Sequence, residues 1–214
     1  MTERAALVRI YAGEHGAYWN RIERSRPRTL WEDNLVAVRR RVRRLLFDWL
    51  DPLAEQTVLD LGCGLGSLSL QLARRGARVV GLDVLPRIAA APEPGLGFVV
   101  ADLEAPPMAG EAFTVAILDE VLEDHALEDR LAVVRAAAAW RVRRLLLVNR
   151  VEPEWSLVRA RRIPGGARAV DTVELYRGVH LETPYFLARR EILHRRNCSL
   201  ELAEFTLSHQ WAEV

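Results

Sequence analysis

The sequence contains no lysine, and all 30 of its basic residues are arginine. An active site built on lysine side chains is therefore excluded. Only two cysteines are present, Cys63 and Cys198, and they lie far apart in the chain. No disulfide framework is expected, and a reducing, cytoplasmic location is the default expectation. No apolar run approaches the length of a membrane span, and residues 1–4 lack the apolar core of a signal peptide.

The composition is that of one ordinary globular domain. The chain has 214 residues, half of them hydrophobic, and neither glycine nor proline is in excess, which excludes disordered and collagen-like classes. A net charge of +1 gives no global field that attracts nucleic acid. Residues 135–168 are nevertheless arginine-rich. A solvated helix face explains this stretch, and a basic rim that binds an acidic substrate is the alternative.

Apolar runs and helical periodicity alternate along the chain. The expected strands are 57–61, 78–82, 97–101, 114–119 and 144–149, and the expected helices are 67–75, a short one near 84–91, and 126–140. This alternation predicts an α/β fold, a doubly wound parallel sheet with helices on both faces. Apolar residues three or four positions apart from Leu35 to Trp49 predict a preceding helix, ended by Asp51-Pro52, within an N-terminal helical cap.

Residues 60–66 (Asp-Leu-Gly-Cys-Gly-Leu-Gly) separate the first strand from the first helix. Glycines let the backbone approach a bulky ligand closely, and the helix that follows offers free N–H groups. Asp83 closes the second strand, where a carboxylate is placed to accept both hydroxyls of a ribose. Together these features predict a nucleoside with an anionic tail as the ligand.

The glycine spacing separates two such ligands. A dinucleotide fingerprint places its third glycine five residues after the first, whereas here Gly66 follows Gly62 by four. Asp60, just before the turn, suits a ligand with a cationic amino group, such as S-adenosylmethionine. At this point the chain resembles the class I S-adenosylmethionine-dependent methyltransferases, whose first motif D/E-x-G-x-G-x-G residues 60–66 match in full. A dinucleotide-binding or purely structural unit is the alternative.

The resemblance implies a Rossmann-like seven-stranded sheet, mostly parallel, with an antiparallel C-terminal strand. It divides a single domain, residues 1–214, into a helical cap (1–50), a cofactor-binding core (55–149), a substrate-side insertion (150–184), and a C-terminal helix and hairpin (185–214), with the helix at 185–196 and strands at 199–207 and 210–214. The cap and insertion loosely resemble those of tetrapyrrole carboxyl methyltransferases and quinone-pathway O-methyltransferases.

The resemblance also implies S-adenosyl-L-methionine as the cofactor. The cofactor-binding residues that it implies are Asp60, Gly62, Cys63, Gly64, Asp83, Val84, Asp102, Leu103 and Asp119. Three of these carboxylates have a simpler interpretation that stays open. Asp60 alone would cap the turn, Asp83 would cap the helix after it, and Asp102 is a residue type common in turns.

Residues 118–125 (Leu-Asp-Glu-Val-Leu-Glu-Asp-His) follow the fourth strand, and the resemblance places them beside the methyl group and its acceptor. They contain neither the Asn/Asp-Pro-Pro-aromatic run of enzymes that methylate base amines nor the cysteine of cytosine-C5 enzymes. The absence of lysine excludes the ribose 2′-O tetrad. These exclusions leave O-, N- or C-methylation of a small molecule as the leading class, and O-methylation is the prediction. An RNA-modifying enzyme using the arginine-rich face, or a cofactor-binding protein without catalysis, stays open.

The acids after the fourth strand are interpreted as helix-start residues, so no metal site is expected. A general base near neutral pH suits histidine, and His125 is best placed, although a surface role is the alternative. The substrate-side candidates are Tyr11, Trp19, Tyr176 and His180, in the two segments expected to cover the pocket. The expected partner is a small-molecule methyl acceptor, with no membrane span and no nucleic acid.

Overall fold

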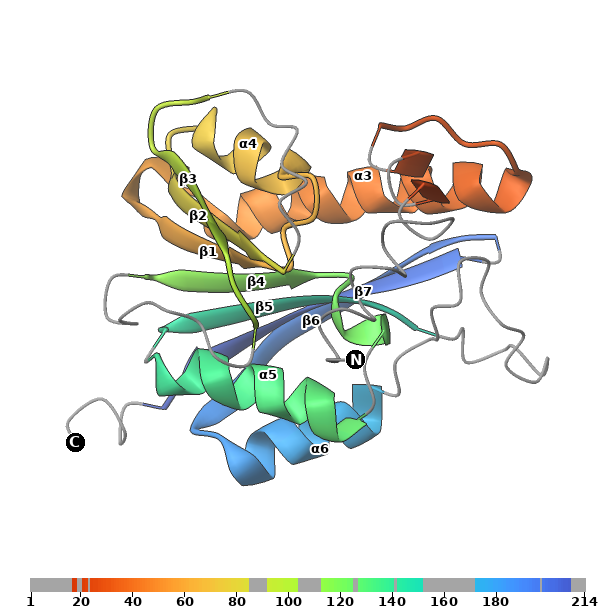
Figure 1. The fold of residues 1–214 in the computed structure, drawn as a ribbon. Coiled ribbons are helices and arrows are strands. Elements are labelled where there is room, and N and C mark those ends of the chain that lie inside the picture. Colours follow the sequence, from red (N-terminus) through yellow and green to blue (C-terminus); the bar gives the residue numbers. More distant parts are fainter. Residues whose placement is uncertain are drawn as a thin grey trace, which may run out of the picture.

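A seven-stranded sheet forms the centre of the protein, with strand order β3-β2-β1-β4-β5-β7-β6 (Figure 1). The computed structural model describes residues 17–18, 21–22, 24–84, 92–103, 113–124, 127–140, 142–151, 172–196 and 198–208. The strands are β1 (Thr57–Leu61), β2 (Arg78–Asp83), β3 (Leu96–Val100), β4 (Val115–Asp119), β5 (Arg144–Arg150), β6 (Tyr185–Arg195) and β7 (Cys198–Leu207). The pairings among β1 to β5 are parallel, and β7 is antiparallel to both of its neighbours. The predicted fold class is confirmed.

Helices cover both faces of the sheet (Figure 1). The helices are α3 (Leu30–Leu50), α4 (Ser67–Ala73), α5 (Leu127–Ala139) and α6 (Thr172–Glu182), with 3-10 turns η1 (Leu53–Glu55) and η3 (Leu122–Asp124). Successive strand residues point to opposite faces, so Val58 of β1 packs in the core under α3 and α4 while Leu59 packs in the core under α5 and α6. Both faces are therefore buried, which explains the continuous apolar runs of the central strands. Among the described helices, none combines the length and apolarity that crossing a membrane requires.

Helix α3 begins with a Thr29 side-chain cap, which accepts a hydrogen bond from the Glu32 N–H at 3.1 Å. Its predicted apolar stripe is buried, and it packs against β6 and β7. Gly76, with φ 98°, follows the end of α4 in a left-handed conformation that glycine adopts readily. Helices α3 and α4 lie on the same face of the sheet. Side chains of α3 reach the carboxyl ends of the strands.

The helix predicted over 185–196 is wrong, because Tyr185–Arg195 is strand β6. Its alanine, arginine, glutamate and leucine residues favour a helix, but ten residue pairs with β7 override that local preference. The predicted C-terminal hairpin therefore pairs 185–195 with 198–207, one strand earlier than expected. Helix α6 lies at the end of the segment 150–184, which was predicted as the substrate-side insertion. The strand predicted at 210–214 lies outside the described residues.

The chain order creates a switch point between β1 and β4. From β1 the chain proceeds outward to β2 and β3, then returns to place β4 on the other side of β1. The registers bring the carboxyl ends of these strands to one edge, since Leu61 pairs with both Leu82 and Leu118. Ligands of open α/β sheets bind at such an edge. We therefore expect the ligand-binding site to be formed by the residues that follow these strand ends.

Candidate active site

The glycine turn after β1 is held in a left-handed backbone conformation. Gly62, Gly64 and Gly66 have φ values of 72°, 57° and 77°, which residues with a Cβ rarely adopt. A Cβ on Gly62 would lie 2.5 Å from a methyl carbon of Val121, beyond β4. A Cβ on Gly64 would meet nothing within 4 Å. The turn thus packs against β4 through Gly62 and leaves open space beside Gly64.

The ends of β2 and β3 lie beside this turn. The Asp83 carboxylate accepts a hydrogen bond from the Gly64 N–H at 2.9 Å. The Ala101 N–H donates to the Asp83 carbonyl oxygen at 3.0 Å, which holds the residues after β3 next to β2. Asp102 is exposed and Leu103 is buried. Asp83, Asp102 and Leu103 are thus brought to one edge with the glycines, as predicted, and Val84 follows Asp83 as a partly exposed residue.

Asp60 is buried at the end of β1, with 1% of its surface exposed. Its carboxylate accepts a hydrogen bond from the Ser69 hydroxyl in α4 at 2.5 Å. The Asp60 side chain thereby links β1 to α4. This structural contact is close to the turn-capping role that was the alternative interpretation of Asp60. A contact between Asp60 and the cofactor stays a prediction.

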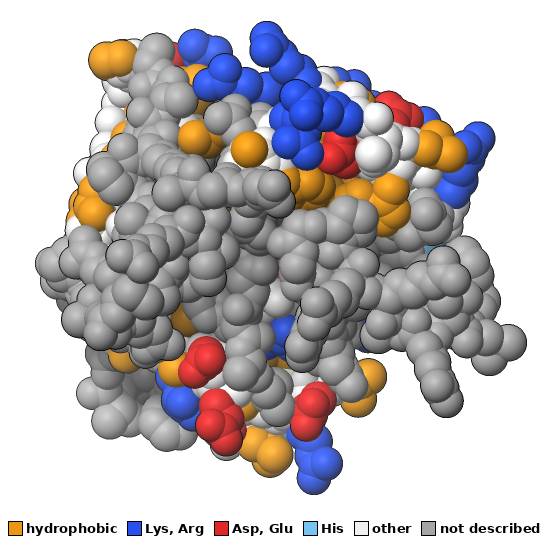
Figure 2. Space-filling model, turned by 45° about the vertical axis from the view of Figure 1, so that its right-hand side comes forward, with side chains coloured by type: hydrophobic (Ala, Val, Ile, Leu, Met, Phe, Trp, Pro, Cys, Tyr) orange, Lys and Arg blue, Asp and Glu red, His pale blue; other side chains and the backbone are white. Residues whose placement is uncertain are grey.

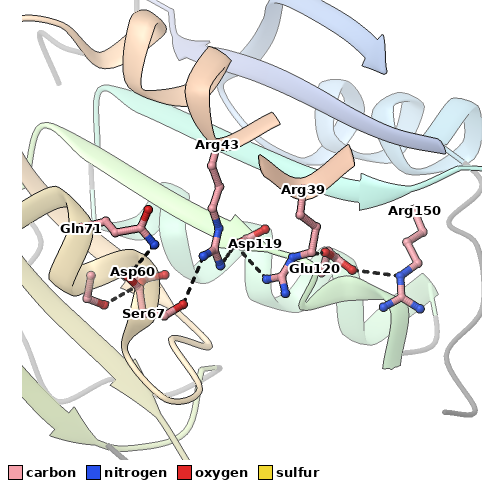
Figure 3. A network of polar contacts seen from close by, with 9 residues as sticks. Arg39, Arg43, Asp60, Ser67, Gln71, Asp119, Glu120 and Arg150 are labelled. Atoms are coloured by element: carbon pink, nitrogen blue, oxygen red, sulfur yellow. Dashed lines mark hydrogen bonds and ion pairs between the residues drawn. The ribbon is translucent and has the colours of Figure 1, made fainter. Parts of the chain in front are cut away.

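A row of buried charges crosses the carboxyl edge from the glycine turn toward β5 (Figure 3). This charge row consists of Arg43, Asp119, Arg39, Glu120 and Arg150. An Asp119 oxygen lies 2.9 Å from Nη2 of Arg43 and 3.4 Å from Nη2 of Arg39. Glu120 continues the row, with its two oxygens 2.7 Å from Nε of Arg39 and 2.9 Å from Nε of Arg150. Asp119, predicted as a cofactor residue, is therefore one member of an alternating ion-pair network.

Arg43 links this row to the cofactor turn. Its Nη1 donates to the hydroxyl of Ser67, the first residue of α4, at 3.2 Å, while its Nη2 contacts Asp119. The sequence analysis did not identify Arg39 and Arg43 as site residues. The spacing of these two arginines could have indicated a shared role. They are four residues apart, so they lie on one helix face, directly beside Val38 and Val42.

Glu123, in η3, lies behind the row and was also missed as an individual site residue. One of its oxygens accepts a hydrogen bond from the Arg150 backbone N–H at 2.7 Å, and the residue is 3% exposed. Burial, with the neighbouring Glu120 carboxylate, raises the pKa of Glu123 to about 8. Glu123 is therefore neutral at pH 7. Among the described residues no group of histidine, cysteine, aspartate or glutamate side chains is arranged to hold a metal ion.

Replacing Glu123 by glutamine is expected to flatten the pH dependence of stability. The pKa of this carboxyl is higher in the folded than in the unfolded protein, so its stabilising effect is complete below the unfolded pKa and is lost as pH rises through about 8. Glutamine does not titrate. The free energy of unfolding of Glu123→Gln relative to wild type should therefore rise by about 1.4 kcal/mol per pH unit between pH 6 and pH 7. Urea denaturation at each pH measures this difference, and parallel curves for the two proteins would refute it.

The substrate-side predictions are only partly within the described residues. Tyr176 lies in α6 with its hydroxyl buried, and His180 is exposed in the last turn of the same helix. Tyr11, Trp19 and His125 lie outside the described residues and stay predictions. Both cysteines are poor nucleophiles: burial, with Asp60 and Asp83 nearby, raises the pKa of the Cys63 thiol, and burial raises that of Cys198 to about 12.

Comparisons with known proteins match the chain to methyltransferases. Residues 59–142 match the family described as methyltransferase domain, and this stretch runs from β1 to just before β5. In Pseudomonas aeruginosa, the 23S rRNA (uracil(1939)-C(5))-methyltransferase RlmD is 41% identical over 118 residues, which cover 50% of this chain and 25% of that protein. A ubiquinone biosynthesis O-methyltransferase of Methylobacterium is 43% identical over 96 residues, covering 42% of this chain and 38% of the relative. The chain thus spans well under half the length of these relatives.

Solved structures match over nearly the whole chain. Magnesium protoporphyrin IX methyltransferase from Synechocystis, crystallised with S-adenosylmethionine, has a TM-score of 0.76 at 22% identity and covers 97% of this chain and 99% of its own. A 1,6-didemethyltoxoflavin-N1-methyltransferase from Burkholderia thailandensis has a TM-score of 0.66 at 14% identity, covering 97% and 92%. At such identities the likeness shows the fold.

The domain match and the fold together confirm the sequence prediction. Residues 59–142 match a methyltransferase domain, and the fold is that of S-adenosylmethionine-dependent methyltransferases, some of which are crystallised with that cofactor or its product.

Proposed function

We propose that the protein transfers a methyl group from S-adenosylmethionine to an oxygen of a small organic acceptor. The observation that carries the proposal is the edge formed by the glycine turn, Asp83 and Asp119. Gly64 borders open space, and the Asp83 carboxylate stands at the end of β2, so the residues present fit a nucleoside. Arg43 and Asp119 supply one positive and one negative group, which together suit the zwitterionic amino acid end of the cofactor.

The bound cofactor supplies a methyl group that is already electrophilic, because the sulfonium is a good leaving group. The protein residues then have three tasks. Asp83 would hold the ribose, Arg43 and Asp119 would fix the amino acid end, and the buried charge row would keep β4 and β5 in register beneath the acceptor. Alignment of nucleophile and methyl group, with water excluded, contributes most of the rate in such a reaction. His125 is proposed as the general base that takes the proton of a hydroxyl acceptor.

Two observations support a small acceptor over a pyrimidine ring carbon. The whole chain superimposes on enzymes named for small acceptors, whereas it shares only 25% of the length of the uracil-C(5) methyltransferase from Pseudomonas. A C5 carbon is a weak nucleophile and needs a thiolate to activate the ring. Burial raises the pKa of both Cys63 and Cys198, so both remain thiols at neutral pH.

RNA methylation at another atom is the second candidate. Surface arginines gather along the rim formed by α3 and α4 (Figure 2), where Arg40, Arg41, Arg44, Arg74 and Arg75 are exposed. Binding through such a surface would depend on counterion release, so affinity would fall steeply with salt. The 135–168 segment, considered earlier for this role, lies largely outside the described residues.

The deciding experiment follows the labelled methyl group of S-adenosylmethionine. The purified protein is incubated with total RNA and, separately, with a panel of phenols, carboxylic acids and amines, and S-adenosylhomocysteine is quantified in each. We expect turnover with a hydroxyl or carboxyl compound and none with RNA. Label in RNA, with binding that falls steeply between low and physiological salt, would contradict the proposal. Cofactor binding with no turnover on either set would favour a non-catalytic protein.

A further inference from the structure

Residue 120 has a backbone conformation that is unusual for a buried glutamate. Among the described residues, three other than glycine have a positive φ: Ser25, Glu120 and Arg196. Ser25 and Arg196 lie exposed in turns, whereas Glu120 is 6% exposed in the bend that follows β4. A positive φ is costly for a residue with a long side chain, and such strain is concentrated at functional sites. The presence of glutamate there, instead of glycine, requires an explanation.

The Glu120 side chain supplies that explanation, because it connects the two elements beside the bend. Its oxygens lie 2.7 Å from Nε of Arg39 in α3 and 2.9 Å from Nε of Arg150 in β5 (Figure 3). Its backbone N–H donates to the Val148 carbonyl oxygen of β5 at 2.9 Å. Glycine would adopt the same φ without strain but would make neither ion pair. The bend is thus fixed on both sides by one residue.

The residues before and after the bend contact the two ends of the glycine turn. Asp119, before the bend, lies 2.9 Å from Nη2 of Arg43, whose Nη1 donates to the hydroxyl of Ser67, the first residue after the turn. Val121, after the bend, packs so closely against Gly62 that a Cβ on Gly62 would lie 2.5 Å from a Val121 methyl carbon. The bend therefore contacts the turn through Val121 at one end and through Asp119 and Arg43 at the other.

The position of the bend bears on one end of the cofactor more than on the other. Arg43 and Asp119 are the proposed contacts of the amino acid end, so a displacement of the bend would move both. A displacement of about 1 Å is enough to impair a site that relies on alignment. The adenosine end differs, because Asp83 would hold it at the end of β2, which lies on the other side of β1 from β4.

We propose that Glu120 is a positioning residue, which holds the bend after β4 against the glycine turn and thereby sets the place of the cofactor's amino acid end. Glu120 acts through Asp119 and Val121 and not by contact with the cofactor. This role rests on the proposed function for the placement of the cofactor at this edge of the sheet.

Two ligands test this role, because adenosine lacks the amino acid end that S-adenosylhomocysteine has. Glu120→Gln is expected to weaken binding of S-adenosylhomocysteine by about tenfold and to leave the affinity for adenosine within about twofold of wild type. Glutamine has one acceptor oxygen, so it fixes the bend to only one of the two arginines. Calorimetry measures both affinities at a temperature at which thermal denaturation shows each variant to be folded.

Glu204→Gln is the matched control for the binding measurements. Glu204 is also buried between two arginines, with its oxygens 2.6 Å from Nε of Arg144 and 2.7 Å from Nε of Arg189, but it lies in β7, two strands away from β4. Its replacement should lower stability while leaving both affinities unchanged. Equal losses for the two ligands in Glu120→Gln, or unchanged affinities for both, would show that Glu120 supports only the fold and would overturn the proposal.

Val121→Ala tests the same contact without changing a charge, and it decides the question if Glu120→Gln does not fold. Removal of the two methyl groups that pack at Gly62 should weaken S-adenosylhomocysteine binding by about threefold, again without an effect on adenosine. An unchanged affinity for S-adenosylhomocysteine in Val121→Ala would contradict the positioning role.

The methyl-transfer assay separates this role from the proposed function. The expected binding pattern without turnover on any small acceptor removes the proposed function alone. Turnover on a small acceptor, together with equal losses of affinity for the two ligands in Glu120→Gln, removes the positioning role alone.

Discussion

Glu120→Gln is expected to lower the free energy of unfolding by about 3–5 kcal/mol near pH 6. Glu120 has 1% of its side chain exposed and lies between two arginines, with oxygens 2.7 Å from Arg39 and 2.9 Å from Arg150. Glutamine keeps the shape but removes the charge, which leaves both buried guanidinium groups without the carboxylate that they share. Residue 120 has a φ of 58°, which costs glutamine and glutamate the same conformational energy. The substitution therefore changes only the electrostatic interactions of the side chain.

Glu123 makes this loss depend on pH. The Glu120 carboxylate is one of the groups that keep the pKa of Glu123 at about 8, and Arg150 acts in the opposite direction. Without Glu120, Glu123 ionises more readily and compensates part of the charge of Arg150. The destabilisation should therefore be smaller at pH 9 than at pH 6. Chemical denaturation of Glu120→Gln, Glu123→Gln and the double variant measures the coupling between the two sites.

Glu93→Gln is the matched control for Glu120→Gln. Glu93 also pairs with an arginine, Arg74, at 3.1 Å, but the two side chains are 27% and 58% exposed. Ion pairs at such exposure contribute about 0–1 kcal/mol. A loss for Glu120→Gln no larger than that of the control would show that the buried row does not stabilise the fold.

Asp83→Ala is expected to weaken S-adenosylmethionine binding by at least about 100-fold while leaving the fold intact. A carboxylate that accepts two ribose hydroxyls contributes about 1.5–3 kcal/mol for each hydrogen bond. The hydrogen bond that Asp83 accepts from Gly64 in the structure is exposed, so water replaces it at little cost to stability. Calorimetry gives the affinity, and thermal denaturation checks the fold.

A modified ligand sharpens this test. The 2′-deoxy analogue of S-adenosylhomocysteine lacks one of the two hydroxyls, so it should bind wild type more weakly than the parent ligand. Asp83→Ala should discriminate little between the two, because the partner of that hydroxyl is gone. Asp48→Ala, at an exposed residue of α3, should preserve both affinities. An unchanged affinity in Asp83→Ala would remove this carboxylate from the cofactor site.

The sequence by itself predicted the cofactor half of the site. The elements there are short and contiguous: β1, the glycine turn, α4 and β2 follow one another from Thr57 to Asp83. Glycine at positions of positive φ and a carboxylate at a strand end are requirements of local backbone and ligand chemistry, which spacing in a sequence records. The same local information predicted the strands β1 to β5 within one residue at each end.

Only the tertiary structure decided the other half. Arg39 and Arg43 meet Asp119 across 80 and 76 residues of chain. Strand β6 shows the same limit, because pairing with β7 made a strand of a segment whose residues favour a helix. Long-range pairing gains its energy from partners that a local pattern does not name. The sequence therefore predicted the cofactor, while the charge row exists only because folding brings distant side chains together.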